Sequence, residues 1–177
     1  MKESARAAIS YVRQIASKYG IPADFYTKKD IHIHFPEGAV PKDGPSAGVT
    51  TLTALVSALS GIPVRRDISM TGEITIRGNV LAVGGLREKT MAAYSAGVRT
   101  IIIPADNLKD LDKIDPVVRE NVIFIPCRRG TEVLAHALVS SIESDTPSAK
   151  NQEDETINLP LTTSTRVRAE ARGKNKK

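Results

Sequence analysis

The chain has 177 residues, 41% of them hydrophobic and 25% charged, which is enough for one folded domain with a hydrophobic core. Its net charge of +5 equals the surplus of residues 166–177, so residues 1–165 are neutral overall and do not favour a nucleic-acid-binding surface. The single cysteine excludes an internal disulfide framework, and no apolar run approaches the roughly 20 residues of a membrane span. We therefore expect a cytoplasmic location.

The first third of the chain predicts two helices and one strand. Residues 2–19 have apolar side chains at helical spacing, and Gly20 follows them as a stop signal. Residues 30–35 alternate apolar side chains with histidines, which is typical of a half-buried strand. An apolar stripe over residues 52–59, closed by Gly61, predicts the second helix.

The middle of the chain predicts a hairpin, a third helix and two buried strands. Residues 67–85 have a β pattern, with a two-residue turn expected at Gly78-Asn79. A helix is predicted over residues 86–96, and the short apolar runs 99–105 and 122–126 predict buried strands. Strands that alternate with helices predict a mixed fold of packed α and β layers.

A serine stands between two glycines in the segment GPSAG, where the second predicted helix begins. Ser46 can be interpreted as a helix cap, a position that serine often occupies. It can also be a nucleophile, because the N–H groups and positive dipole end of a helix N-terminus stabilise an oxyanion. Gly44 and Gly48 would then allow a substrate to approach closely.

The same segment matches the G-x-S-x-G nucleophile elbow of α/β hydrolases. Candidate partners follow in the hydrolase order: Asp106, Asp110, Asp112 and His136. An elbow needs a buried strand directly before its serine, whereas residues 36–43 are polar and flanked by prolines. The context therefore disfavours this alternative.

Lys89 falls within the apolar stripe of the third predicted helix. At 100° per residue it lies on the same side as Leu86, Thr90 and Ala93. Desolvation there would favour the neutral amine, which is a general base able to activate a serine hydroxyl. Ser46 and Lys89 therefore form a candidate Ser-Lys pair. The alternative is that the lysine stem lies along the core edge and its ammonium reaches water.

Two histidines and a glutamate form a possible metal-binding pattern, His32-x-His34-x-x-Glu37. Nothing else in the chain completes this set, since His136 and Cys127 are isolated in sequence. We therefore expect the histidines to cover the polar side of the strand or to line a cleft. The chain contains no Walker A phosphate loop.

Three long segments resemble one known family. They are PKDGPSAG around Ser46, TGEITIRGNVLAVGGLREK from Thr71 to Lys89, and the following SAGVRTIIIPADN. In this order and spacing they resemble the proteolytic domain of Lon, the ATP-dependent serine protease of bacteria and organelles. The resemblance covers roughly residues 1–140 and implies an α+β fold of the ribosomal protein S5 domain 2-like type, a mixed sheet with helices packed on it.

The resemblance implies a role for six of the residues. Ser46 would be the nucleophile, Lys89 the general base, and Thr71 a hydrogen-bond partner of the lysine amine. Three more would lie beside this pair: His34, Glu37 and Asp43. Asp43 in similar domains can swing toward the lysine and block the site, although here it can equally cap the helix that begins near residue 45.

The resemblance also implies partners. It implies a hexameric ring, unfolded polypeptides as substrates, and an AAA+ ATPase module, in cis or in trans, that would use ATP and Mg²⁺. This chain itself would need no cofactor or metal. The ATPase module and the first strands of the proteolytic domain are missing from the sequence, so we expect peptidase activity at most, without unfolding of folded proteins.

Two further expectations complete the interpretation. Residues 141–177 match nothing recognisable and are predicted to form a disordered tail with a basic end, able at most to contact nucleic acid or polyphosphate weakly. The alternative to a protease is a non-catalytic module for binding or assembly, because domains of this fold also occur without a catalytic pair, for instance in recombination proteins.

Overall fold

A parallel three-stranded sheet lies at the centre of the fold. Its strands are β1 (Ile68–Met70), β4 (Thr100–Pro104) and β5 (Ile123–Cys127), in the order β1-β4-β5. Residues 101–104 of β4 are all buried, as expected for the middle strand of a parallel sheet that is covered on both faces. The strands predicted at 99–105 and 122–126 are thereby confirmed.

The computed structural model describes residues 2–35 and 44–139, which all belong to one compact unit spanning Met1–Ser144. The predicted tail, residues 141–177, lies outside the described residues. Among the described helices the longest, α1, has 14 residues, and none is long and apolar enough to cross a membrane.

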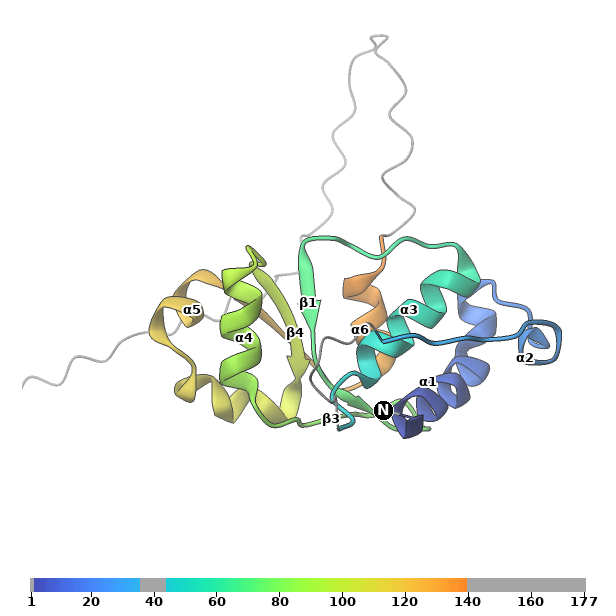
Figure 1. Cartoon of the computed structure of the whole chain (residues 1–177), viewed down its shortest axis with the longest axis horizontal. Coiled ribbons are helices and arrows are strands. Elements are labelled where there is room, and N and C mark those ends of the chain that lie inside the picture. Colours follow the sequence, from blue (N-terminus) through green and yellow to red (C-terminus); the bar gives the residue numbers. More distant parts are fainter. Residues whose placement is uncertain (1, 36–43, 140–177) are drawn as a thin grey trace, which may run out of the picture. The chain divides into compact units, whose positions relative to one another are not determined.

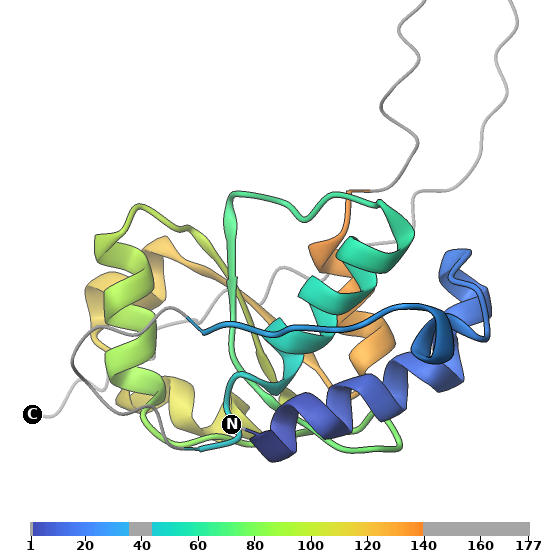
Figure 2. The ribbon, with the colours of Figure 1, turned by 45° about the vertical axis from the view of Figure 1, so that its right-hand side comes forward.

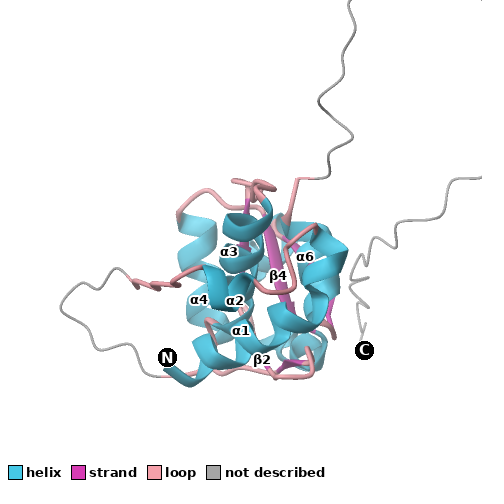
Figure 3. Cartoon of the chain, turned by 90° about the vertical axis from the view of Figure 1, so that its right-hand side faces the viewer, coloured by secondary structure: helices cyan, strands magenta, loops and turns pink. Residues whose placement is uncertain are grey.

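Helices cover both faces of the sheet (Figure 1). One layer contains α1 (Lys2–Ile15), α3 (Gly48–Ser60) and α6 (Gly130–Ala137), whose apolar side chains share a core with Ile102. The other contains α4 (Leu86–Ser95) and α5 (Pro116–Asn121), which pack on Ile101 and Ile103. Because successive side chains of β4 point to opposite faces, one strand serves both cores. Figure 3 shows the strands between these helices.

Short helical turns join these elements. The 3-10 helix η1 (Ala16–Tyr19) continues α1, and α2 (Phe25–Lys28) follows it. A longer 3-10 helix, η2 (Ala105–Lys113), leads from β4 toward α5. The mixed layers agree with the predicted α+β class, and the three helices predicted from periodicity are confirmed with small shifts at their ends.

The predicted hairpin exists, but its turn is not at Gly78-Asn79. Strands β2 (Glu73–Ile74) and β3 (Val80–Leu81) pair antiparallel, so five residues connect them. The turn spans Thr75 to Gly78, where the Gly78 N–H donates to the Thr75 carbonyl at 2.9 Å. Gly78 has φ +79°, and a side chain there would collide with the Tyr11 ring. The glycine therefore ends the turn instead of occupying its centre.

The strand predicted at residues 30–35 is wrong. This segment runs past α3 (Figure 2) but pairs with no strand among the described residues. Its alternation is nevertheless real, because Ile31 and Ile33 pack against the core while His32 and His34 are exposed. An alternating sequence pattern shows that successive side chains face the core and the solvent in turn. It does not by itself show that the segment pairs with another strand.

The start of α3 packs tightly against β2. A Cβ atom added to Gly48 would lie 2.6 Å from the backbone nitrogen of Ile74 and 3.2 Å from the Gly72 carbonyl oxygen. Neither backbone atom can move without distorting the hairpin. Gly48 is therefore required for this internal contact between α3 and the hairpin.

We predict that Gly48→Ala destabilises the domain by about 1–3 kcal/mol, because overpacking against backbone forces a local shift. Thermal and urea unfolding of the purified chain measure this change. The control is Gly84→Ala, since an added Cβ there has nothing within 4 Å. Equal midpoints for the two variants would contradict the prediction.

Candidate active site

Backbone hydrogen bonds fix Ser46 beside the central sheet. Its carbonyl accepts the Gly72 N–H at 3.0 Å and the Thr71 hydroxyl at 3.3 Å, while the Val49 N–H donates to the Gly72 carbonyl at 3.1 Å. Ala47 and Gly72 form an isolated parallel bridge at the same place. The residues just after β1 therefore hold the entry to α3 from both sides.

The side chain of Ser46 is not a helix cap. Helix α3 begins at Gly48 with Ala47 in the N-cap position, and among the described residues no side-chain hydrogen bond caps it. The cap interpretation of this serine is therefore wrong. Its half-buried side chain instead lines a cavity of about 380 Å³ at the N-terminus of the helix.

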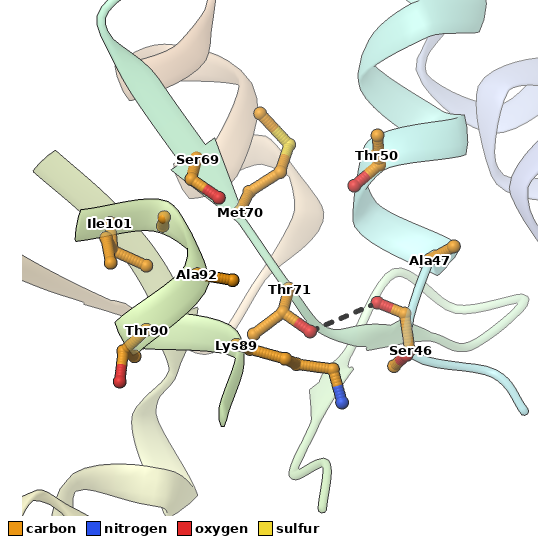
Figure 4. Close-up of a pocket in the computed structure, with 11 residues that line it drawn as sticks. Ser46, Ala47, Thr50, Ser69, Met70, Thr71, Lys89, Thr90, Ala92 and Ile101 are labelled. Carbon is orange, nitrogen blue, oxygen red and sulfur yellow. Dashed lines mark hydrogen bonds between the residues drawn. The ribbon is translucent and has the colours of Figure 1, made fainter. Parts of the chain in front are cut away.

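Lys89 lines the same cavity from the opposite side. Its side chain reaches from α4 toward Thr71 and Ser46 (Figure 4). Besides Ser46, Lys89 and Thr71, the cavity is lined mainly by small or apolar side chains: Ala47, Thr50, Ser69, Met70, Thr90, Ala92, Ala93 and Ile101. Two residues 43 positions apart in sequence thus face one cavity, with Thr71 between them.

Of the two alternatives for Lys89, the exposed one is confirmed and burial in the apolar stripe is wrong. The buried residues of α4 are Leu86 and Thr90, and Lys89 is exposed. On a helical wheel Lys89 lies about 60° from Leu86, away from Thr90, which places it at the edge of the buried stripe. Its amine donates to the Gly84 carbonyl at 2.7 Å, and no hydrogen bond among the described residues joins it to Ser46.

The implied supporting residues are only partly described. Thr71 lines the cavity, and its hydroxyl donates a hydrogen bond to the Ser46 carbonyl. His34 instead lines a neighbouring groove of about 530 Å³ between residues 29–35 and α3, and this groove shares Thr50 with the Ser46 cavity. Glu37 and Asp43 lie outside the described residues.

The rival chemistries find no support in the described residues. None of the candidate elbow partners lines the Ser46 cavity: Asp110 pairs with Lys113, Asp112 with Arg119, and His136 lies on α6. Within residues 2–35 and 44–139, no three His, Cys, Asp or Glu side chains group as a metal site would require.

Comparison with known proteins gives the family. Residues 1–140 match the family described as the Lon protease (S16) C-terminal proteolytic domain. The chain belongs to the Lon protease family. Relatives include the Lon protease of Brevibacillus choshinensis, 59% identical over 145 residues, and Lon protease 1 of Bacillus subtilis (strain 168), 60% identical over 139 residues. The predicted resemblance to Lon is confirmed.

The match covers most of this chain but little of its relatives. It includes 82% of the chain and 19% of the Brevibacillus Lon protease, and 78% and 18% for the Bacillus subtilis Lon protease 1. The Lon protease of Chloroflexus aggregans, 56% identical over 138 residues, gives the same picture, with 17% of its length matched. The similarity is therefore to one part of a longer protein.

Burial makes the thiol of the single cysteine, Cys127, unreactive. Cys127 ends β5 and is 1% exposed, and burial raises the pKa of its thiol to about 11. Glu132, which lies nearby, acts in the same direction. A thiol with this pKa is protonated at neutral pH, so it is not a nucleophile.

We predict that Cys127 does not react with iodoacetamide in the folded chain at pH 8, where only about one thiol in a thousand is ionised. Reaction should become fast once urea unfolds the chain, because exposure restores an ordinary thiol. Mass spectrometry of the modified chain measures both rates. Rapid alkylation of the folded protein would show that the thiol is accessible and contradict the prediction.

Proposed function

We propose that this chain is a serine endopeptidase domain in which Ser46 is the nucleophile and Lys89 the general base. The observation that carries the proposal is the shared cavity: a serine at a helix N-terminus and a lysine from another helix face one space in a chain of the Lon family. No metal or nucleotide takes part in the proposed bond cleavage.

The reaction proceeds by acyl transfer. The Ser46 oxygen attacks the peptide carbonyl carbon while its proton passes to the neutral Lys89 amine. The resulting ammonium gives that proton to the departing amine nitrogen, which leaves an ester on Ser46. Water then attacks the ester, Lys89 again takes the proton, and the serine hydroxyl is restored as the acid product leaves.

Backbone donors would stabilise the negative charge on the substrate oxygen. The N–H groups of Ser46 and Ala47 have no acceptor among the described residues, and they precede a helix whose dipole favours negative charge. We assign the oxyanion to this place. Thr71 fixes the serine backbone, and its hydroxyl oxygen still has lone pairs with which to accept a hydrogen bond from the Lys89 amine.

The exposed Lys89 amine needs a desolvated state to act as a base. A polypeptide lying in the cavity would exclude water from the amine, and this disfavours its charged form. The Gly84 carbonyl can keep one N–H of the neutral amine while its lone pair faces the serine. Binding of substrate and formation of the base are thus coupled.

Membership in the Lon family supports a proposal for the wider assembly. We propose an S5 domain 2-like fold, unfolded polypeptides as substrates, a hexameric ring and coupling to an AAA+ ATPase module that uses ATP and Mg²⁺, in the cytoplasm. His34, Glu37 and Asp43 are proposed to lie near the catalytic pair when substrate is bound, with Asp43 as a regulatory residue. Without the ATPase module the chain acts on peptides and does not unfold folded proteins.

We predict that a fluorophosphonate probe modifies the intact chain at Ser46. Ser46→Ala should abolish the modification, and Lys89→Ala should slow it by roughly a thousandfold, because the hydroxyl then lacks a base. Intact-mass measurement and peptide mapping give the rate and the modified residue. Cleavage of a fluorogenic peptide should fall in parallel.

Two matched controls are available on α4, outside the cavity wall. Ser95 is an exposed serine and Arg87 is another exposed cation, and neither lines the cavity. Ser95→Ala and Arg87→Ala should both keep the wild-type modification rate. A folded chain that never reacts with the probe would overturn the protease proposal and favour a binding or assembly module.

A further inference from the structure

A buried asparagine is bonded to the loop that leads into α4. Asn107, in η2, is 2% exposed. Its side-chain oxygen accepts the Val83 N–H at 3.0 Å, and its nitrogen donates to the Val83 carbonyl at 3.0 Å. One carboxamide therefore satisfies both backbone groups of a single residue, as a neighbouring strand would, and fixes the peptide planes on both sides of Val83.

The orientation of this carboxamide is itself fixed. Its nitrogen also donates to the Asp110 carboxylate at 2.9 Å, and Lys113 donates to the other oxygen of that carboxylate at 2.9 Å. Both hydrogen bonds hold the pKa of Asp110 below its ordinary value, with the Lys113 bond the stronger cause. A reversed amide would place its oxygen against the carboxylate, so only one orientation is stable.

The loop fixed in this way holds the Lys89 amine. Gly84 and Gly85 directly follow Val83, and Gly85 has φ +67° at the N-cap of α4. The Lys89 backbone N–H donates to the Gly85 carbonyl at 3.1 Å, and its amine donates to the Gly84 carbonyl at 2.7 Å. Two successive glycines are conformationally free by themselves, so their carbonyl directions depend on the bonds made to Val83.

We propose that Asn107 is a positioning residue for Lys89, acting through the Val83 backbone and the Gly84 carbonyl. The inference rests on the proposed function, because the position of the lysine amine affects catalysis only if Lys89 is the general base. Asn107 does not line the Ser46 cavity, so it has no direct contact with a substrate there. Its effect is transmitted by one backbone loop.

The experiment uses a peptidyl phosphonate ester, whose inactivation rate constant kinact and binding constant KI are separable on the intact chain. Asn107→Ala should lower kinact by about a hundredfold, because a misplacement of the catalytic amine by roughly 1 Å costs about that much in rate. KI should not change. In a Lys89→Ala background, Asn107→Ala should cause no further loss of kinact, because the amine that Asn107 positions is already absent. An equal loss in both backgrounds, or no loss at all, would overturn the proposal.

Two additional variants separate positioning from general stability. Asn107→Asp keeps the shape and the acceptor for the Val83 N–H but places an oxygen against the Asp110 carboxylate and the Val83 carbonyl, so it should lower kinact, and its thermal unfolding shows whether the chain remains folded. Asn121→Ala is the matched control, since Asn121 also donates to a main-chain carbonyl, that of Val117 in α5, away from the cavity. It should leave kinact unchanged; a loss equal to that of Asn107→Asp would overturn the proposal.

Hydrogen exchange tests the loop without requiring catalysis. In Asn107→Asp the amides of residues 83–89 should exchange at least about tenfold faster than in the wild-type chain, and those of β4 should not change. If the wild-type chain does not react with the phosphonate, the protease proposal fails and exchange alone decides the positioning role. Unchanged exchange over residues 83–89 would overturn that role even in an active enzyme.

Discussion

The hydrogen bond from the Gly72 N–H to the Ser46 carbonyl links the candidate site to the sheet. Directly before it, the Thr71 N–H donates to the Ile102 carbonyl at 3.1 Å and continues the pairing of β1 with β4. The position of Ser46 is therefore fixed through β1 to β4, the most buried of the described strands. Gly72 leaves room for this contact, because a Cβ there would lie 3.0 Å from both Val49 and Val80.

The cavity lies where the two cores meet the end of β1. Met70 packs against the core of α1, α3 and α6, whereas Ile101 belongs to the core of α4 and α5, and both line the cavity. The buried Thr53 hydroxyl also contacts the Met70 sulfur at 3.4 Å. Each wall of the site is therefore the edge of a packed layer, and the distance between its two helices is set by the sheet between them.

Local patterns predicted the helices well and the environment of single residues less well. Gly61 ends α3 with φ +78°, as its place after an apolar stripe indicates. The sequence left the burial or exposure of Lys89 open, because a helical wheel gives relative directions on a helix, and only the packed neighbours determine where the buried arc is centred. The same limit explains residues 30–35, whose alternation is present without a paired strand.

Long-range contacts were beyond sequence reasoning for a different reason. The bonds between Asn107 and Val83 cross 24 positions, and no periodicity links an asparagine after one strand to a loop after another. Ser46 and Lys89 were paired only because their chemistry is complementary and their segments resemble Lon. Sequence patterns identify candidate reactive side chains, but the hydrogen bonds that orient these side chains are formed only in the tertiary fold.

The exposure of Lys89 has a consequence for how such a site can be controlled. The Lys89 amine is exposed and donates to the Gly84 carbonyl, so the proposed mechanism requires that water be excluded from this amine before it acts as a base. Covering the cavity removes water from the amine and from the Ser46 hydroxyl at once. In the proposed mechanism, a polypeptide segment that fills the cavity supplies this desolvation, and a peptide too short to fill it does not.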